Sequence, residues 1–546
     1  MKLWSAVSAA VLLASSCLAA TPTERLAQQS QLAQALAAKH AYSDAATVLA
    51  TLAHDPDITG LPGWPDAVYD LARDEAASGQ SEQAMAALHQ AVEFGATPDA
   101  DTVAGETAFA PLAKDARFKA ELERLKKAAA LWQDNAAIAT PFKPVLSEEE
   151  KAAGVSKLWS EAKFNFAFFG RVPDLDWDGE YVKALREAHA AQTTEAYYGV
   201  LARFVALLKD GHTRVVAPPQ LSDRLYAEAP VTTALIDGKI IVTGVSDPAV
   251  AIARGSELVT INGEPAFAYA ARAVAPSVFG FTEQDRNAWQ YGYQLLRGPV
   301  DQPVTLGLRL ANGRLVSTNV SRHHNTGMVG YAPAFVASEF KLIGDVAYLR
   351  VGTMFTDEGA KLMRAHAAEI GAAKGLVIDV RDNGGGNSSN GLLLLQMMAD
   401  KPFETYRYST REYIAAYRSW GHVPGWHREA AGLVAPDSAL HIGGKVVVLV
   451  GAKTYSSAED FVAGFKVMKR GTIVGQTTGG STGNPINMTL PGGGLAMICS
   501  KEDTYPDGSK FVGVGVLPDV AVKPSIADVR AGRDHELETA IRLLTK

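Results

Sequence analysis

Apolar and polar residues alternate along this chain in two different periods. Helical periodicity dominates up to about residue 208, most clearly in the Ala-rich stretches 67–79 and 80–95, which predict two amphipathic helices meeting at Gly79. Helices are also predicted over 147–164 and 180–208. A strand-rich block then covers 230–322, where the Asn-Gly pairs at 262–263 and 312–313 indicate hairpin turns.

From about residue 345 the pattern becomes that of an α/β domain. Continuous apolar runs at 345–351, 375–380 and 445–450 predict buried strands, and stretches with helical periodicity at 356–370, 390–398 and 457–468 separate them. Alternating strands and helices predict a sheet covered by helices. Any chemistry is therefore expected in the loops that leave these strands.

The first twenty residues read as a secretory signal peptide. Lys2 precedes an apolar run that is too short to span a bilayer, and small residues follow it. Ordinary export is favoured, although Cys17 keeps a lipid anchor open because the preceding Ala-Ser-Ser loosely resembles a lipobox. No later segment is apolar enough to cross a membrane. We expect an exported protein, periplasmic or secreted.

Composition excludes several classes of protein. The 546 residues carry 52 Lys and Arg against 59 Asp and Glu, a formal net charge of −7, which argues against a nucleic-acid partner. The two cysteines, Cys17 and Cys499, do not support a disulfide framework. No His-Glu-x-x-His motif or other recognised metal-ligand spacing occurs, so we expect neither a metal nor a cofactor.

Three loops carry candidate chemistry. Residues 379–389 contain three successive glycines between a strand and a helix, which suits binding of an oxyanion by backbone N–H groups. Ser456 opens a helix after a strand, but spacing alone favours a capping box with Glu459. Ser481, in Gly-Gly-Ser-Thr-Gly, matches a nucleophile elbow by pattern, yet a strand follows it where the elbow needs a helix, and we expect it to be a decoy.

A serine nucleophile needs a base. Of the 12 histidines, His212 lies in a compact polar loop, Asp210-Gly-His-Thr213, directly after a long apolar helix. Sequence alone does not place it beside Ser456.

Taken in order, these loops resemble the tail-specific (C-terminal processing) serine peptidases, in the branch of the tricorn core and the interphotoreceptor retinoid-binding protein repeats. The resemblance covers about residues 145–530, and the matching stretches are 208–213, 377–386, 454–461, 475–480 and 505–519. It implies a multidomain α+β and α/β protein with a crotonase/ClpP-like α/β core and a PDZ-like β-domain. The helices of 67–95 resemble a tetratricopeptide hairpin, so they are expected to lie in an all-helical, repeat-like N-terminal domain.

The expected domains follow from these matches. They are a signal peptide at 1–20, a tetratricopeptide-like domain at 21–135, a helical subdomain carrying His212 at 145–228, a PDZ-like domain at 229–330 and a peptidase core at 331–546.

The resemblance assigns roles to particular residues. Ser456 is the implied nucleophile and His212 its general base, with the N–H groups of Ser457 and Gly385 as the oxyanion hole. The lysine of the tail-specific branch falls in Gly480-Ser481-Thr482, where this chain has none, so the histidine-dependent branch fits better.

Two departures leave the group that orients His212 open. Gly211 stands where tricorn-like proteins have serine, and Val512 stands where an acid is expected. Asp210, Glu502 and Asp503 are the candidates. The histidine is expected to titrate near neutrality.

The implied activity is endopeptidase cleavage of unfolded or C-terminally recognised polypeptides. Three alternatives stay open: a non-catalytic protein that binds peptides or lipophilic ligands on the same fold, an α/β-hydrolase-type esterase using Ser481 with His535, and a scaffold whose activity lies in the helical N-terminal block.

Overall fold

The computed structural model describes residues 21–325 and 336–546. The chain divides into two compact units between Asn135 and Ala136, and each is described by itself. The predicted signal peptide and Cys17 lie outside the described residues. Among those residues, no helix combines the length and the apolar character needed to cross a bilayer.

The first unit is entirely helical. Thr21 caps its first helix in a capping box with Glu24, and the helices predicted at 67–79 and 80–95 are present, separated at Gly79 where the backbone has φ 83°. Trp64 and Phe109 are among its fully buried side chains. The helices are α2 (Pro22–Ala37), α3 (Tyr42–Ala53), α4 (Trp64–Ala77), α5 (Ser81–Glu93), α6 (Ala100–Gly105), the 3₁₀ turn η1 (Thr107–Leu112) and α7 (Ala116–Ala130). The tetratricopeptide-like character of this unit stays a prediction.

The second unit begins with the helices that deliver His212. The helix predicted over 180–208 is broken at 191–193, because the Thr193 hydroxyl accepts the N–H of Ala196 and starts a new helix. Strand β1, directly after His212, pairs antiparallel with β18, with Arg214 opposite Met497. The elements are α8 (Glu148–Asn165), η2 (Phe169–Arg171), α9 (Trp177–Ala190), α10 (Thr194–Ala206), β1 (Arg214–Val216), η3 (Pro219–Leu221) and α11 (Ser222–Leu225).

A small antiparallel β-domain follows, with strand order β2-β3-β4-β6-β7 and β5 paired to β4. Asn262 and Gly263 have φ 50° and 82°, the conformation of the predicted hairpin turn. Short helices between β5 and β6 complete the domain. The elements are β2 (Val231–Ile236), β3 (Lys239–Val245), β4 (Glu257–Ile261), β5 (Glu264–Pro265), α12 (Ala266–Tyr269), η4 (Ala270–Val274), η5 (Ala275–Ser277), α13 (Glu283–Asn287), η6 (Ala288–Tyr293), β6 (Val304–Arg309) and β7 (Leu315–Val320).

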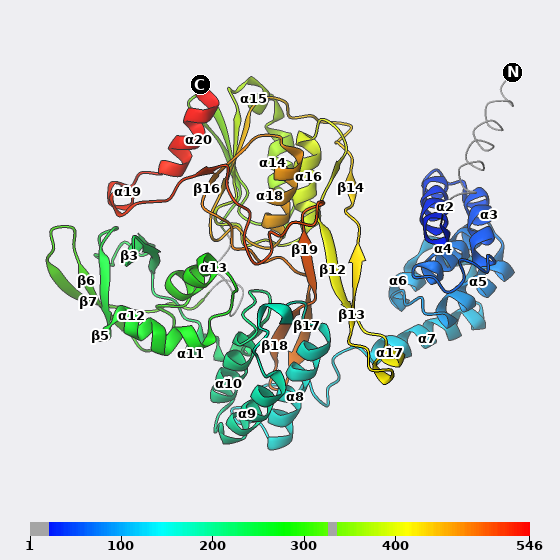
Figure 1. The fold of residues 1–546 in the computed structure, drawn as a ribbon, viewed down its shortest axis with the longest axis horizontal. Helices are drawn as coiled ribbons and strands as arrows, with labels where there is room; N and C mark the ends of the chain where they lie inside the picture. Colours follow the sequence, from blue (N-terminus) through cyan, green and yellow to red (C-terminus); the bar gives the residue numbers. More distant parts are fainter. Residues whose placement is uncertain (1–20, 326–335) are drawn as a thin grey trace. The chain divides into compact units, whose positions relative to one another are not determined.

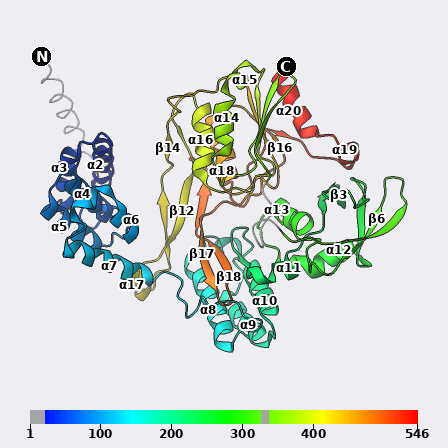
Figure 2. The same ribbon diagram turned by 180° about the vertical axis from the view of Figure 1, so that it is seen from behind.

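The α/β core is a six-stranded sheet of order β20-β16-β15-β10-β9-β8, parallel except for β8. Side chains along its strands point alternately to the two faces of the sheet. Ile378 and Val448 belong to a core cluster with buried residues of α14, α16 and α18, whereas Val377 and Val447 cluster with buried residues of α20. Figures 1 and 2 show these helices beside the sheet. The elements are β8 (Glu339–Ile343), β9 (Val346–Arg350), α14 (Glu358–Ala365), α15 (Ala367–Ala372), β10 (Leu376–Asp379), α16 (Ser388–Met398), β15 (Val446–Val450), α18 (Ser457–Met468), β16 (Thr472–Gly475), β20 (Val520–Ala521), α19 (Ile526–Ala531) and α20 (His535–Thr545).

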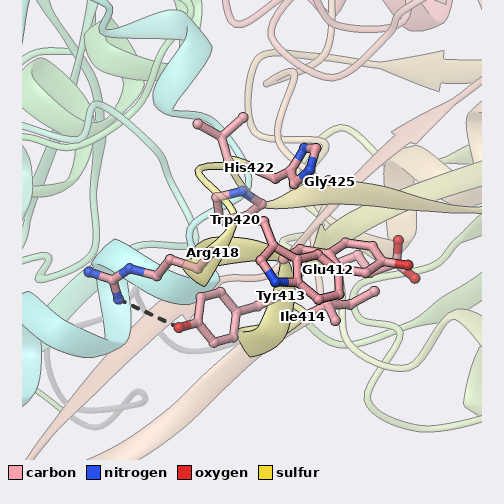
Figure 3. Close-up of a pocket in the computed structure, with 10 residues that line it drawn as sticks. Glu412, Tyr413, Ile414, Arg418, Trp420, His422 and Gly425 are labelled. Carbon is pink, nitrogen blue, oxygen red and sulfur yellow. Dashed lines mark hydrogen bonds between the residues drawn. The ribbon is translucent and has the colours of Figure 1, made fainter.

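Smaller sheets extend from this core. β17 (Pro485–Leu490) and β18 (Gly494–Cys499) pair with β1, while β12 (Arg407–Glu412), β13 (Gly425–Glu429) and β19 (Lys501–Thr504) form a second sheet. β11 (Phe403–Glu404) pairs with β14 (Leu433–Val434). The β12–β13 hairpin ends in α17 (Ala415–Ser419), where Trp420 and Tyr413 help line a surface pocket of about 460 Å³ (Figure 3).

Candidate active site

The loops singled out in the sequence converge on one place in the second unit. The loop after β10 carries the three glycines 384–386, the loop after β15 carries Ser456, and the loop after α10 carries His212. β10 and β15 are adjacent and parallel, so their carboxyl ends lie side by side. A Cβ built on Gly385 would lie 2.6 Å from Ser456 Cβ, which shows how closely the first two loops approach.

Ser456 has an unusual backbone. It precedes α18 with φ 54° and ψ −128°, a region that is costly for a residue with a side chain. Its side chain forms no capping hydrogen bond, so the capping box that spacing favoured does not form. The serine hydroxyl is instead directed to His212 Nε2 at 2.9 Å, across 244 residues of sequence.

His212 is held on all sides. Its ring is 4% exposed and stacks on Tyr455, with centroids 5.2 Å apart and planes 19° from parallel. Its backbone N–H donates to Asp210 Oδ2 at 3.1 Å. Burial, reinforced by the positive charges of Arg214 and Lys501, lowers the pKa of His212 to about 3. The expectation that this histidine titrates near neutrality is therefore wrong, because sequence gives no measure of desolvation.

Nδ1 of His212 lies 2.9 Å from Ser481 Oγ, the residue that sequence analysis set aside as a decoy. The strand β17 does follow Ser481, as predicted, so the nucleophile-elbow geometry is absent. One signal pointed to this position: it coincides with the place of the lysine in the tail-specific branch.

The hydrogen bonds and ion pairs of the three carboxylates considered as orienting groups do not involve the imidazole Nδ1. Asp210 accepts the backbone N–H of His212 and the Thr213 hydroxyl. Glu502 pairs with Arg171 and Lys510, and Asp503 pairs with Lys501 and accepts the Thr482 hydroxyl. The position that we expected a carboxylate to occupy, beside the imidazole Nδ1, is held by the Ser481 hydroxyl.

Ser457 and Gly385, whose N–H groups are the expected oxyanion hole, both lie next to Ser456. Ser457 N–H is in the first turn of α18, where N–H groups have no acceptor within the helix and the helix dipole is positive. Gly385 N–H donates to Asn383 Oδ1 at 2.9 Å in this structure. Gly385 has φ 100°, so a side chain there is excluded by both conformation and space.

A buried carboxylate that sequence reasoning assigned only to a cap lies behind these loops. Glu459 is fully buried and accepts the N–H groups of Gly480 and Ser481 at 2.7 and 2.8 Å, together with the Thr478 hydroxyl. Burial raises the pKa of Glu459 to about 7, and these hydrogen bonds oppose the rise.

Ser481 and His535, the two residues of the esterase alternative, have different partners. His535 lies at the start of α20, and its nearest acid is Glu538, with Nδ1 3.9 Å from Oε2. Ser481 instead contacts His212.

Within residues 21–325 and 336–546, no group of three His, Cys, Asp or Glu side chains is arranged to hold a metal ion. Cys499 is a free, buried thiol.

Comparisons with known proteins find similarity to C-terminal processing peptidases. Residues 345–522 match the sequence profile of "Peptidase family S41". A "C-terminal processing peptidase, chloroplastic" from Tetradesmus obliquus is 25% identical over 411 residues, covering 71% of this chain and 80% of the relative. A "Carboxyl-terminal-processing protease" from Synechocystis sp. is 26% identical over 208 residues, 37% of this chain and 44% of the relative.

A solved structure shares the fold. The structure titled "mature CPAF complexed with lactacystin" superposes with a TM-score of 0.57 at 16% identity, over 73% of this chain and 98% of that one. The likeness is one of fold. Residues 345–522 thus match peptidase family S41, and the chain is a serine-type peptidase.

Proposed function

We propose that the protein is an exported endopeptidase of the tail-specific, tricorn-like type, with Ser456 as nucleophile and His212 as general base. The observation that carries the proposal is the 2.9 Å contact between Ser456 Oγ and His212 Nε2. A nucleophile and a base within hydrogen-bond reach, both oriented by other groups, are the signature of an activated serine.

The reaction would proceed by acyl transfer. His212 Nε2 takes the proton of Ser456 as Oγ attacks the peptide carbonyl. The imidazolium then gives this proton to the leaving amine as the C–N bond breaks. Water attacks the acyl-enzyme with His212 again as base, which releases the carboxylic acid and restores the serine.

The oxyanion of each tetrahedral intermediate needs two donors. Ser457 N–H is suited to be the first, since it points out of the first turn of α18. We propose Gly385 N–H as the second, exchanging its bond to Asn383 Oδ1 for the substrate oxygen when substrate binds. Apo geometry of this kind commonly tightens only in the complex.

Substrates are proposed to be unfolded or tail-exposed polypeptides. A cavity of about 890 Å³ is lined by residues 233–236 of β2 on one side and by residues 451–453, just before the nucleophile, on the other. β2 is an edge strand of its sheet, and an extended peptide is recognised by adding to such an edge. This supports a PDZ-like role for the β-domain. The helical first unit as a tetratricopeptide-like accessory, and export directed by residues 1–20, are proposed from the sequence alone.

A peptide-library digest tests the proposal. Wild type should cleave unstructured peptides, while Ser456→Ala and His212→Ala should lose activity by at least about 10³-fold. Ser388→Ala is the matched control, because it removes a part-buried hydroxyl that bonds Asp460 on the same helix as Glu459. Turnover by Ser456→Ala at the wild-type rate would refute the assignment.

Among the residues that the structure describes, the partner of His212 Nδ1 is the Ser481 hydroxyl and not a carboxylate. This favours one second candidate, a protein that retains the fold and binds peptides or lipophilic ligands without cleaving them. Labelling with a fluorophosphonate separates the two. Covalent modification at Ser456, identified by mass spectrometry of the labelled peptide, supports the peptidase. A fold that binds peptide but leaves Ser456 unlabelled supports the binding protein.

A further inference from the structure

The group beside His212 Nδ1 is a hydroxyl where hydrolases of this kind use an acid. In a Ser-His-Asp triad, a carboxylate accepts Nδ1–H and so keeps Nε2 free to accept the serine proton. Here the atom at 2.9 Å from Nδ1 is Ser481 Oγ. We propose that Ser481 is the positioning residue of this site, and that Glu459 fixes it there by holding the loop on which it lies. The inference rests on the proposed roles of Ser456 and His212.

The first support is the tautomer that the two contacts require. For Nε2 to accept the Ser456 proton, Nδ1 must carry the hydrogen and donate it. The Ser481 oxygen can accept this hydrogen, since a hydroxyl has two lone pairs. Stacking of the ring on Tyr455 then leaves the imidazole little freedom to turn away.

The second support is the way Glu459 holds the loop. Its two carboxylate oxygens accept the N–H groups of Gly480 at 2.7 Å and Ser481 at 2.8 Å. Its own N–H donates to the carbonyl of Ser456 at 2.7 Å. In return, the Ser481 carbonyl accepts the N–H of Ser456 at 3.0 Å. One buried carboxylate therefore fixes the nucleophile and the residue on the far side of the imidazole relative to each other.

The third support concerns the two positions, 211 and 512, at which a polar side chain beside His212 was expected and is not found. A Cβ on Gly211 would come 1.4 Å from Tyr455 Oη, so a serine before the histidine is excluded while this tyrosine stacks on His212. Val512 is buried and apolar, and its carbonyl accepts from Arg171. With glycine at 211 and valine at 512, neither side chain can form a hydrogen bond to the His212 ring. The bond that orients the ring is formed by Ser481 instead.

The consequence is a weaker base than a complete triad supplies. A hydroxyl fixes the tautomer but brings no negative charge to stabilise the imidazolium. The charged groups that face His212 are Asp210, at its backbone N–H, and Arg214 and Lys501, whose positive charges disfavour protonation. Glu459 bonds the Ser481 backbone and not the ring.

Three variants of the full-length protein test the inference. Ser481→Ala should lower kcat on an unstructured peptide about 10²-fold and leave KM within about threefold, because the variant loses the tautomer of His212 and keeps the binding of substrate. For comparison, replacing the carboxylate of a Ser-His-Asp triad by an amide lowers kcat about 10⁴-fold. Ser481→Thr keeps the hydroxyl and should restore kcat to within about tenfold. Thr482→Val is the matched control, since Thr482 is equally buried and bonds Asp503, and its kcat should stay within about threefold.

A measurement on wild type keeps the inference testable if Ser481→Ala does not fold. Nitrogen-15 spectra of the histidine rings, with His212 assigned by comparison with His212→Gln, should show the hydrogen on Nδ1 at pH 7. A hydrogen on Nε2 in the resting enzyme would overturn the inference, as would an unchanged kcat in folded Ser481→Ala. Glu459→Gln should lower kcat as Ser481→Ala does, and an unchanged kcat there would remove Glu459 from the proposal.

The outcomes separate the two proposals. If Ser456→Ala is inactive while Ser481→Ala is fully active, the proposed function stands and only the positioning role falls. If Ser456→Ala remains active, the proposed function itself is wrong.

Discussion

The pH profile of peptide cleavage provides a direct test of the burial of His212. A histidine in water has a pKa of about 6.5, and burial together with Arg214 and Lys501 lowers that of His212 to about 3. The difference of roughly three pH units corresponds to about 4–5 kcal/mol for placing a proton on this ring instead of on an exposed one. Between these pH values the free base persists, so kcat/KM should remain high down to about pH 5.

The lowered pKa of His212 also affects stability, but unfavourably: it preserves activity as the pH falls, whereas it reduces the free energy of unfolding. Below pH 6.5 the unfolded chain binds a proton on His212 that the folded protein does not bind, so the free energy of unfolding falls by up to about 1.4 kcal/mol per pH unit as the pH decreases. At pH 5 this loss is about 2 kcal/mol. Activity should therefore be measured in short assays, with circular dichroism at each pH to show that the protein is folded.

Glu459 is the other group near the site whose protonation falls in the measured range. Its pKa is raised to about 7 by burial. The profile is therefore recorded for wild type and for Glu459→Gln. An acid limb with its midpoint between pH 6 and 7 in both proteins would refute the argument, because it would show that His212 titrates as an exposed histidine does. A limb near pH 7 that disappears in Glu459→Gln would belong to the carboxylate.

Three further changes have expected outcomes. Gly385→Ala should abolish cleavage while the chain still folds, because the new Cβ would meet the Ser456 side chain and the φ of 100° is strained; activity and circular dichroism measured together check this. Arg381→Met should lower the free energy of unfolding by about 3–5 kcal/mol in urea at pH 7, because it leaves the Asp379, Asp534 and Glu536 carboxylates without their cation; a loss below 1 kcal/mol would contradict it. Asp74→Asn should stabilise the helical unit by about 2–3 kcal/mol at pH 8 and by little at pH 4. Burial raises the pKa of the Asp74 carboxyl to about 6. The protonated carboxyl therefore makes its full contribution to stability below pH 3.8, and this contribution is lost as the pH rises through 6.

The sequence predicted those parts of the fold that depend on local pattern. The apolar runs at 345–351, 375–380 and 445–450 are strands β9, β10 and β15, and the helix at 457–468 has the bounds of α18. The break between α9 and α10 was not predicted, because a single helix was expected over 180–208, whereas Thr193 caps a new helix.

The site could be predicted as far as the order of motifs reaches. Ser456 and His212 were selected because their loops occur in the order of a known family, and the structure brings them into contact. Ser481 could not be assigned from a local template, because its role depends on a contact with a residue 269 positions earlier in the chain. The pKa of His212 was misjudged for a similar reason: desolvation is a property of the assembled fold.

The backbone of Ser456 connects the stability of the site with its chemistry. Holding a side-chain-bearing residue at φ 54° and ψ −128° costs about 1–3 kcal/mol, and such strain persists only where the surroundings over-determine it. Here the N–H of Ser456 is held by the carbonyl of Ser481 and its carbonyl by the N–H of Glu459, while Tyr455 N–H donates to the Asn383 carbonyl. These bonds keep Oγ turned toward His212 instead of toward its own helix, where it would act as an ordinary cap. The loop that bonds the His212 ring is thus the same loop that maintains the strained backbone of Ser456, so a change that loosens it should impair both stability and the proposed catalysis.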